Sequence, residues 1–211
     1  MYEDYPFWFT FFTKLGFRVI ISEKSTRKTY EKGIESMPSE SVCYPAKLSH
    51  GHIMSLINSG IRTIFYPCIP YSRKEFEGAD NKYNCPIVIS YSEVIKNNVE
   101  DIKNVKFINP FLPFDTKNLV KKVMELDEFA EYNFNKKELT EAAISAEAEY
   151  QKCKQDIRDE ATRSLEYIEE NDLKAIVLAG RPYHVDSEIN HGIDTLITSL
   201  GLRCSYGRFY F

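Results

Sequence analysis

Three cysteines occupy positions from which several thiolates could bind one ligand. Cys43, Cys68 and Cys85 each lie next to or near a proline, in segments expected to be loops between strands and helices. Cys43 precedes an amphipathic helix, Cys68 closes an apolar strand-like run, and Cys85 opens the next run after a polar loop. Because such loops can meet at one edge of a parallel sheet, we expect the three thiols to converge. Three thiolates can hold an iron–sulfur cubane and leave one iron open to a substrate.

The same cysteines also have a purely structural interpretation. Their spacing matches no compact ferredoxin or zinc-finger pattern, and free cysteines are often buried and inert. In favour of ligation, Cys43 precedes a helix start, where the helix dipole favours a thiolate, and the prolines stiffen the loops. Cys153 lies on the apolar stripe of a long helix and Cys204 near the end of the sequence, so both are expected to be structural. The residues alone therefore leave ligation and inert burial open.

Polar residues near Cys43 form a second group of candidates. His50 and His52 lie in the predicted helix that follows Cys43. Their i, i+2 spacing points the two rings apart, so they do not form a helical metal pair. Each is either a satisfied histidine of the core or rim, or a donor to the cluster ligands. Glu40, three residues before Cys43, is the carboxylate most favourably placed to join them.

A third group surrounds the carboxyl end of the apolar strand predicted over residues 174–179. Arg181, His184 and His191 lie in the segment after this strand. Ligands bind at such strand ends in open α/β sheets, and an arginine can grip a phosphate or carboxylate bidentately. A capped loop without a ligand is the alternative. The sequence contains no GxGxxG and no GxxxxGK[ST] string, so neither a dinucleotide loop nor an ATP loop is predicted.

The elements that would position these residues alternate between strands and helices. Apolar runs and breakers predict helices over residues 5–15, 25–32, 45–58 and 92–98, and strands over residues 17–22, 63–66, 87–90 and 105–109. This order predicts an α/β fold, a doubly wound parallel sheet forming a Rossmann-like lobe. A helix over residues 115–133 follows, then one long helix or two over 137–171, a buried strand over 174–179, a helix over 193–200 and a strand over 202–205.

We therefore expect three parts. Residues 1–112 form a first α/β lobe with the three-cysteine site, residues 113–172 a long helical spine, and residues 173–211 the start of a second α/β lobe. Because neither lobe looks complete, the sequence reads as a piece of a longer polypeptide.

Composition narrows the class of protein. The 211 residues are 43% hydrophobic and 27% charged, which is typical of a globular protein. The net charge of −4 argues against nucleic acid as a partner, and no run is long and apolar enough to cross a membrane. Five cysteines in a chain of this size argue against a disulfide framework, so a reducing cytoplasm is the expected location.

Several unusual strings resemble one family when they are taken in order. The chain is similar to the uncharacterised domain of large proteins related to the activase of 2-hydroxyglutaryl-CoA dehydratase. The strings are residues 5–9 (YPFWF), 39–47 (SESVCYPAK), 50–52 (HGH), 65–70 (FYPCIP), 83–86 (YNCP) and 181–184 (RPYH).

The resemblance implies a function that the residues alone do not establish. It implies kinship with 2-hydroxyacyl-CoA dehydratase and benzoyl-CoA reductase subunits, which hold a cluster through three cysteines, at positions matched here by Cys43, Cys68 and Cys85. The cofactor would be a 4Fe-4S or double-cubane cluster, which a fragment could lack. The implied partner is an activase ATPase module, on the same or another chain. Its ATP hydrolysis would drive a low-potential electron onto the cluster and then to an acyl-CoA.

Two other functions compete with this one. The first is a non-catalytic domain that docks the ATPase module to a partner, and the second is a zinc-stabilised domain that uses the same thiols. The sequence leaves open whether the chain is itself an enzyme, because it carries no ATPase motif, and whether it forms a homodimer.

Overall fold

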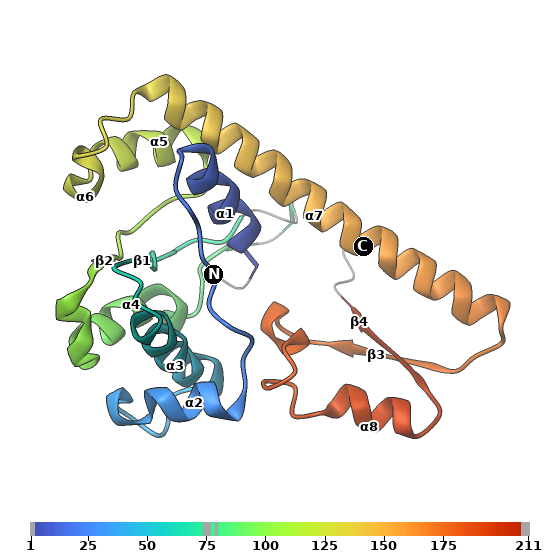
Figure 1. The fold of residues 1–211 in the computed structure, drawn as a ribbon. Helices are drawn as coiled ribbons and strands as arrows, with labels where there is room; N and C mark the ends of the chain where they lie inside the picture. The colour runs from blue at the N-terminus through green and yellow to red at the C-terminus, as the bar shows by residue number, and fades with distance from the viewer. Residues whose placement is uncertain (1–2, 74–76, 79, 208–211) are drawn as a thin grey trace.

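The fold consists of a first lobe, one long helix and a smaller second lobe (Figure 1). A computed structural model describes residues 3–73, 77–78 and 80–207. The described part is mostly helical. Its α-helices are α1 Tyr5–Lys14, α2 Arg27–Gly33, α3 Tyr44–Asn58, α4 Pro86–Asn98, α5 Thr116–Met124, α6 Asp127–Ala130, α7 Lys136–Glu170 and α8 Ile193–Ser199. Its strands are β1 Thr63–Phe65, β2 Lys106–Ile108, β3 Ala175–Ala179 and β4 Arg203–Gly207, and short 3-10 turns span Ile34–Ser36, Glu100–Asn104 and Pro182–Val185.

The predicted doubly wound sheet is not formed in the described part of the chain. Instead there are two separate sheets of two parallel strands, β1 with β2 and β3 with β4. In the first sheet Ile64 lies opposite Phe107, and an isolated parallel bridge between Cys68 and Phe111 extends the pairing past the strand ends. The chain is therefore a mixed α/β protein without a Rossmann sheet.

Two of the predicted strands are wrong. Residues 17–22 are irregular, and the side chains of Ile20 and Ile21 are 49% and 54% exposed, so no second sheet face covers them. Residues 87–90 lie inside α4. A four-residue apolar run cannot distinguish strand from helix, and here Pro86 starts a helix whose later turns bury Tyr91 and Ile95.

The predicted first helix is confirmed and is the centre of the larger core. α1 buries Phe7, Trp8 and Phe11 and ends where Gly16 takes a φ of +87°. Its apolar surface packs against the first half of α7 and against α5. Neighbouring elements cover most of α1, which explains why so short a helix can be apolar on nearly every side.

The long predicted helix is confirmed as a single element. α7 begins at a reciprocal capping box between Asn135 and Glu138. Its first half buries one face, which includes Leu139, Ala143 and Tyr150, whereas its residues beyond 150 are partly or fully exposed. The helix therefore belongs to the first core through one half, whereas its other half lies outside that core and contacts β4, where the Arg203 guanidinium carbon lies 5.4 Å from the centroid of the Tyr167 ring.

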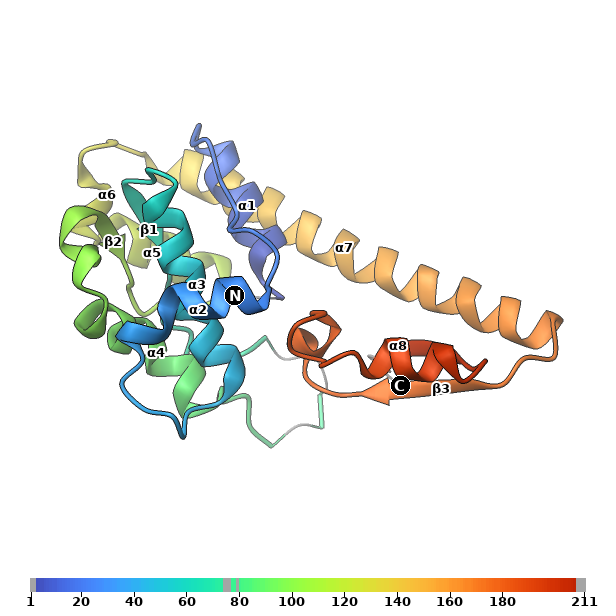
Figure 2. The same cartoon turned by 60° about the horizontal axis from the view of Figure 1, so that its bottom comes forward.

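The second lobe consists of β3, β4 and α8 and lies at the far end of α7 (Figures 1 and 2). The expectation that residues 174–179 form a strand is confirmed, but the strand is not buried, and Ile176 and Val177 are 39% and 40% exposed. Only one partner strand and one short helix accompany it, which is too little to cover a parallel sheet. Of the predicted segment 173–211, residues 208–211 lie outside the described part.

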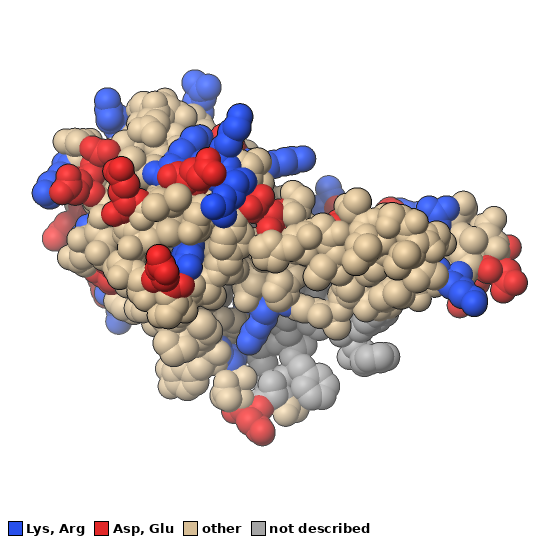
Figure 3. Space-filling view, turned by 90° about the horizontal axis from the view of Figure 1, so that it is seen from below, with Lys and Arg blue, Asp and Glu red and all other residues tan. Residues whose placement is uncertain are grey.

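The surface of the second lobe differs from that of the first. Seen from below, charged side chains gather over the first lobe and at the tip of the molecule, whereas the middle of the second lobe is largely uncharged (Figure 3). Large exposed apolar side chains lie on α8 and at its C-cap, among them Leu196 and Leu200. Among the described residues, no helix combines the length and apolar character required to cross a bilayer.

Candidate functional site

Two of the three candidate cysteines occupy equivalent positions at helix starts. Cys43 is the N-cap residue of α3 and Cys85 the N-cap residue of α4, with nearly identical backbone angles of φ −61°, ψ 148° and φ −58°, ψ 144°. Pro45 and Pro86 lie in the first turns that follow. Both cysteines are exposed, and neither side chain caps its helix through a hydrogen bond. Each sulfur is therefore available to a ligand at the positive end of a helix dipole.

The third cysteine has a different environment. Cys68 follows β1, and its backbone N–H donates to the Pro110 carbonyl at 2.9 Å. Its side chain is fully buried, with Sγ 2.8 Å from the Ser92 hydroxyl oxygen on α4. Burial raises the pKa of the Cys68 thiol, and the Ser92 contact opposes that change. In this conformation the Cys68 thiol is packed in the core and is not accessible to a metal.

The cysteines contribute to the raised pKa values of two tyrosines, Tyr183 and Tyr66. Burial raises the pKa of Tyr183; the Arg181 guanidinium opposes this, and the thiols of Cys43 and Cys85 add to it. Burial likewise raises the pKa of Tyr66, against a hydrogen bond from Ser49 and with contributions from Cys68 and Cys43. Cys43 thus contributes to the raised pKa of both tyrosines. Cys85 contributes to that of Tyr183, and Cys68 contributes to that of Tyr66.

The three sulfurs lie in one region but do not form a closed site. Ser92, whose hydroxyl contacts the Cys68 sulfur, lies seven residues after Cys85. Along the axis of α4 this separation corresponds to about 10 Å. Within residues 3–73, 77–78 and 80–207, no three His, Cys, Asp or Glu side chains are arranged to hold a metal ion. Cys43 and Cys85 fit a soft metal group as exposed thiols, and Cys68 fits one only after it turns away from Ser92. Ligation by the three cysteines stays a prediction.

His50 is a core residue that joins three elements. It is fully buried; its Nδ1 lies 2.8 Å from the Ser36 hydroxyl and its Nε2 lies 3.0 Å from the Tyr91 hydroxyl on α4. Burial lowers its pKa to about 4. The ring is therefore neutral at pH 7 and holds α3 against its neighbours through both nitrogens.

This burial predicts an acid-sensitive contribution to stability. The unfolded state takes up a proton on His50 near pH 6.5 and the folded state only near pH 4, so the contribution is complete above pH 6.5 and is lost as pH falls towards 4. We expect the free energy of unfolding to fall by about 2 kcal/mol between roughly pH 7.5 and pH 5 from this residue. Urea unfolding at the two pH values measures it.

The matched control is His50→Asn, which retains hydrogen-bonding groups but cannot titrate. This variant should be less stable at pH 7.5 and should lose about 2 kcal/mol less on acidification than the wild type. An equal loss in both proteins would mean that His50 is not the titrating group.

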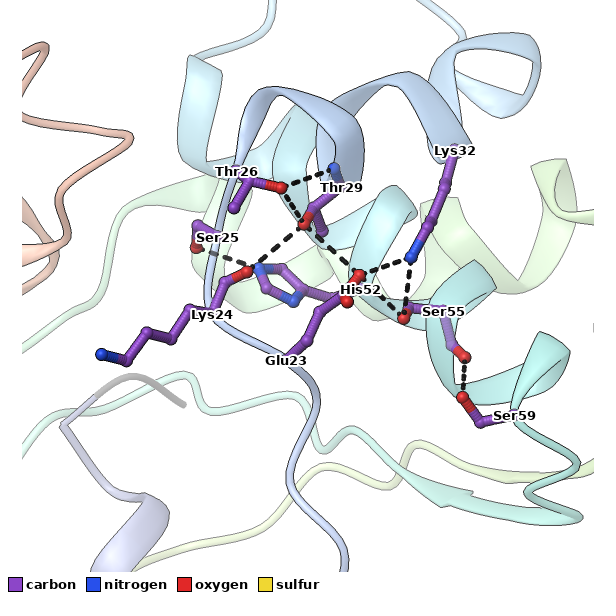
Figure 4. A network of polar contacts seen from close by, with 9 residues as sticks. All are labelled: Glu23, Lys24, Ser25, Thr26, Thr29, Lys32, His52, Ser55 and Ser59. Carbon is purple, nitrogen blue, oxygen red and sulfur yellow. Dashed lines mark hydrogen bonds and ion pairs between the residues drawn. The ribbon is translucent and has the colours of Figure 1, made fainter.

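His52 belongs to a polar network that joins α2 and α3 to the irregular segment before them (Figure 4). Glu23 Oε1 accepts hydrogen bonds from Lys32, from Ser55 at 2.9 Å and from Thr29 at 3.4 Å. The hydrogen bond from Lys32 is the main cause of the lowered pKa of Glu23. This network holds residues 23–26 against the two helices, so the segment has an anchor without pairing as a strand.

The His52 ring lies at the edge of this network. Its Nε2 lies 3.1 Å from the Ser25 hydroxyl, and its Nδ1 is buried without a hydrogen-bond partner in the described structure. Burial lowers the pKa of His52, while Asp186 and Glu23 oppose the change and Lys32 reinforces it. His52 therefore contacts the boundary between the lobes and not the cysteines.

The remaining candidates lie in separate places. Glu40 is exposed in the turn before Cys43. His184 Nδ1 accepts the Arg181 backbone N–H at 2.9 Å and so closes the turn after β3, while the Arg181 side chain is exposed near Tyr183. The ring of His191 lies 5.5 Å from the ring of Tyr44 on α3. A role in binding for any of these residues stays a prediction.

Sequence reasoning missed the residues that join the lobes. The Tyr44 hydroxyl donates to Glu188 at 2.6 Å, and the Ser25 hydroxyl donates to Asp186 at 2.6 Å. Tyr183, whose pKa is raised mainly by burial and further by the thiols of Cys43 and Cys85, was also not predicted as a site residue. The only sequence signal was the position of Tyr44 and Tyr183 within the strings that carry the family resemblance.

The fold and site together define a mixed α/β domain with two exposed cysteines at the N-cap positions of α3 and α4. A family model described as "CoA enzyme activase uncharacterised domain (DUF2229)" matches residues 1–207. The chain belongs to this family, which confirms the resemblance found in the sequence. Neither a curated protein nor a solved structure gives a match to the chain.

Proposed function

We propose that this domain binds an iron–sulfur cluster and transfers electrons within a CoA enzyme activase system. The observation that carries the proposal is the matched pair of Cys43 and Cys85, both exposed at the starts of two helices with nearly identical backbone angles. Thiolates are the usual ligands of such clusters, and helix N-termini favour anionic sulfur. Membership of the activase family supports the setting.

Cys68 is the third ligand in this proposal. Its sulfur must exchange the contact with Ser92 for one with the cluster, while its backbone remains fixed by the bonds to Pro110 and Leu112. When bound, the cluster would accept a single electron at low potential. The donor would be the ATPase module of the activase and the final acceptor an acyl-CoA, and the residues of this chain would bind and shield the site between them.

Anaerobic reconstitution with iron and sulfide tests the proposal. We expect bound iron with broad visible absorbance in the wild type, and loss of both in Cys43→Ser, Cys85→Ser and Cys68→Ser. The matched control is Cys153→Ser, a partly buried thiol on α7, which should retain the cluster. Iron content that is the same in all four variants would contradict the proposal. Zinc retained after aerobic purification would instead favour a zinc-stabilised domain that uses these thiols.

A docking role is the second candidate, and the surface of the second lobe favours it. Large exposed apolar side chains lie on β3 (Ile176 and Val177), on α8 (Leu196) and at the C-cap of α8 (Leu200). The middle of the second lobe is also largely uncharged when seen from below (Figure 3). Parallel sheets are ordinarily covered on both faces, so a covering partner is expected. Binding of the ATPase module that survives all three cysteine substitutions would support docking over electron transfer.

A further inference from the structure

The second lobe is connected to the first in two ways that differ in strength. The covalent connection runs through α7, whose residues beyond 150 are partly or fully exposed and leave the first core. The other connection is the segment after β3, which turns back towards the first lobe (Figures 1 and 2). The side chains of this segment reach the first lobe near the starts of α2 and α3.

Two hydroxyl–carboxylate bonds make this second connection. Asp186 Oδ2 accepts the Ser25 hydroxyl at 2.6 Å, and Glu188 Oε1 accepts the Tyr44 hydroxyl at 2.6 Å. Hydrogen bonds to charged groups are stronger than neutral ones, yet two of them are easily exchanged for water. A tilted contact between the rings of His191 and Tyr44, with centroids 5.5 Å apart, adds a third contact.

The Asp186 carboxylate makes hydrogen bonds both to the first lobe and within its own loop. Asp186 Oδ1 accepts the backbone N–H groups of Glu188 and Ile189 at 3.0 and 3.2 Å, so the same side chain that bonds Ser25 also shapes its own loop. On the other side, the Ser25 hydroxyl also contacts His52. The loop therefore retains its shape when the bond between lobes breaks, and the two lobes can separate without unfolding.

We infer that the second lobe is a hinged arm, held closed by the Ser25–Asp186 and Tyr44–Glu188 bonds. In the closed position the segment lies against the start of α3, because Glu188 accepts the Tyr44 hydroxyl and Tyr44 directly follows Cys43 in the chain. Release of the two bonds carries the segment away from the start of α3 and so from the neighbourhood of Cys43. The inference concerns the arrangement of the lobes and holds whether or not the thiols bind a cluster.

The double variant Ser25→Ala/Tyr44→Phe tests the inference, because it removes both hydroxyls and no carboxylate. In solution scattering we expect a larger radius of gyration than in the wild type. In hydrogen exchange we expect residues 182–192 to exchange about tenfold faster or more, since each lost bond is worth a factor of several. Mass-resolved thiol labelling should be faster at Cys43 and unchanged at buried Cys68.

The matched control is Tyr30→Phe, which alters a neighbouring tyrosine whose ring centroid lies 5.3 Å from that of Tyr44. This control should leave scattering, exchange and labelling as in the wild type. Glu188→Gln, which weakens one bond while keeping its shape, should give an intermediate exchange rate. Unchanged scattering in the double variant, whether or not local exchange rises, would overturn the hinge. A rise in all three measurements for Tyr30→Phe would do the same.

Discussion

Gly51→Ala should destabilise the protein by about 3 kcal/mol, although alanine is the better helix former. Gly51 lies inside α3, where α2 crosses it closely. A Cβ atom there would lie 1.7 Å from the Thr29 carbonyl oxygen, which is backbone and cannot turn aside. The opposing Gly33 is equally confined, with an added Cβ 2.4 Å from the Gly51 nitrogen. The two helices must separate, which disturbs the Glu23 network that anchors residues 23–26. Urea unfolding followed by circular dichroism measures the loss.

Asn58→Ala provides the control on the same helix. Asn58 is the last residue of α3 and is exposed, so its replacement should alter the free energy of unfolding by no more than about 0.5 kcal/mol. If Gly51→Ala proved as stable as the wild type or more so, helix propensity would outweigh the crossing contact, and the close approach of α2 and α3 would be wrong.

The second large effect is expected at Arg73, where Arg73→Ala should cost about 3 kcal/mol. Its side chain is 13% exposed and bonds Glu147 on α7. The guanidinium carbon lies 4.9, 4.3 and 4.2 Å from the ring centroids of Phe7, Phe114 and Tyr150. One side chain thus joins α1, α7 and the segment before α5, and its truncation removes all of these contacts.

Arg73→Met distinguishes packing from charge at this position. Arg73 Nε and Nη2 are buried without hydrogen-bond partners in the described structure. Protein contacts therefore replace only part of the hydration that the guanidinium loses on burial. Methionine fills a similar volume against the three rings, and the exposed third of Glu147 can hydrate. We expect this variant to lose less than about 1 kcal/mol. A loss equal to that of Arg73→Ala would show that the ion pair, and not packing, provides the stability.

The predicted helices are confirmed more often than the predicted strands, for a physical reason. Pro45 at a helix start and Gly16 and Gly60 beyond helix ends are local signals, so they predicted α1 and α3 from the sequence alone. A strand exists only where a partner lies beside it. The apolar residues 17–22 have none, and residues 87–90 follow a proline that starts a helix.

The residues of the candidate site could be predicted better than their arrangement in space. The positions of Cys43 and Cys85 at loop-to-helix boundaries follow from the prolines near them. The orientation of the Cys68 side chain does not, since its contact with Ser92 depends on how α4 packs against β1. Likewise, no local pattern indicates that Ser25 meets Asp186, because 161 residues separate them in the chain.

The half of α7 that lies beyond the first core and contacts β4 gives the molecule mechanical amplification. Its 35 residues form a rod of about 50 Å, of which the first core grips only one end. If the part beyond residue 150, about 30 Å long, turned through about 10°, its tip would move by about 5 Å. Such a displacement exceeds the length of a hydrogen bond, so an angular change too small to disturb either core would be sufficient to disengage the arm.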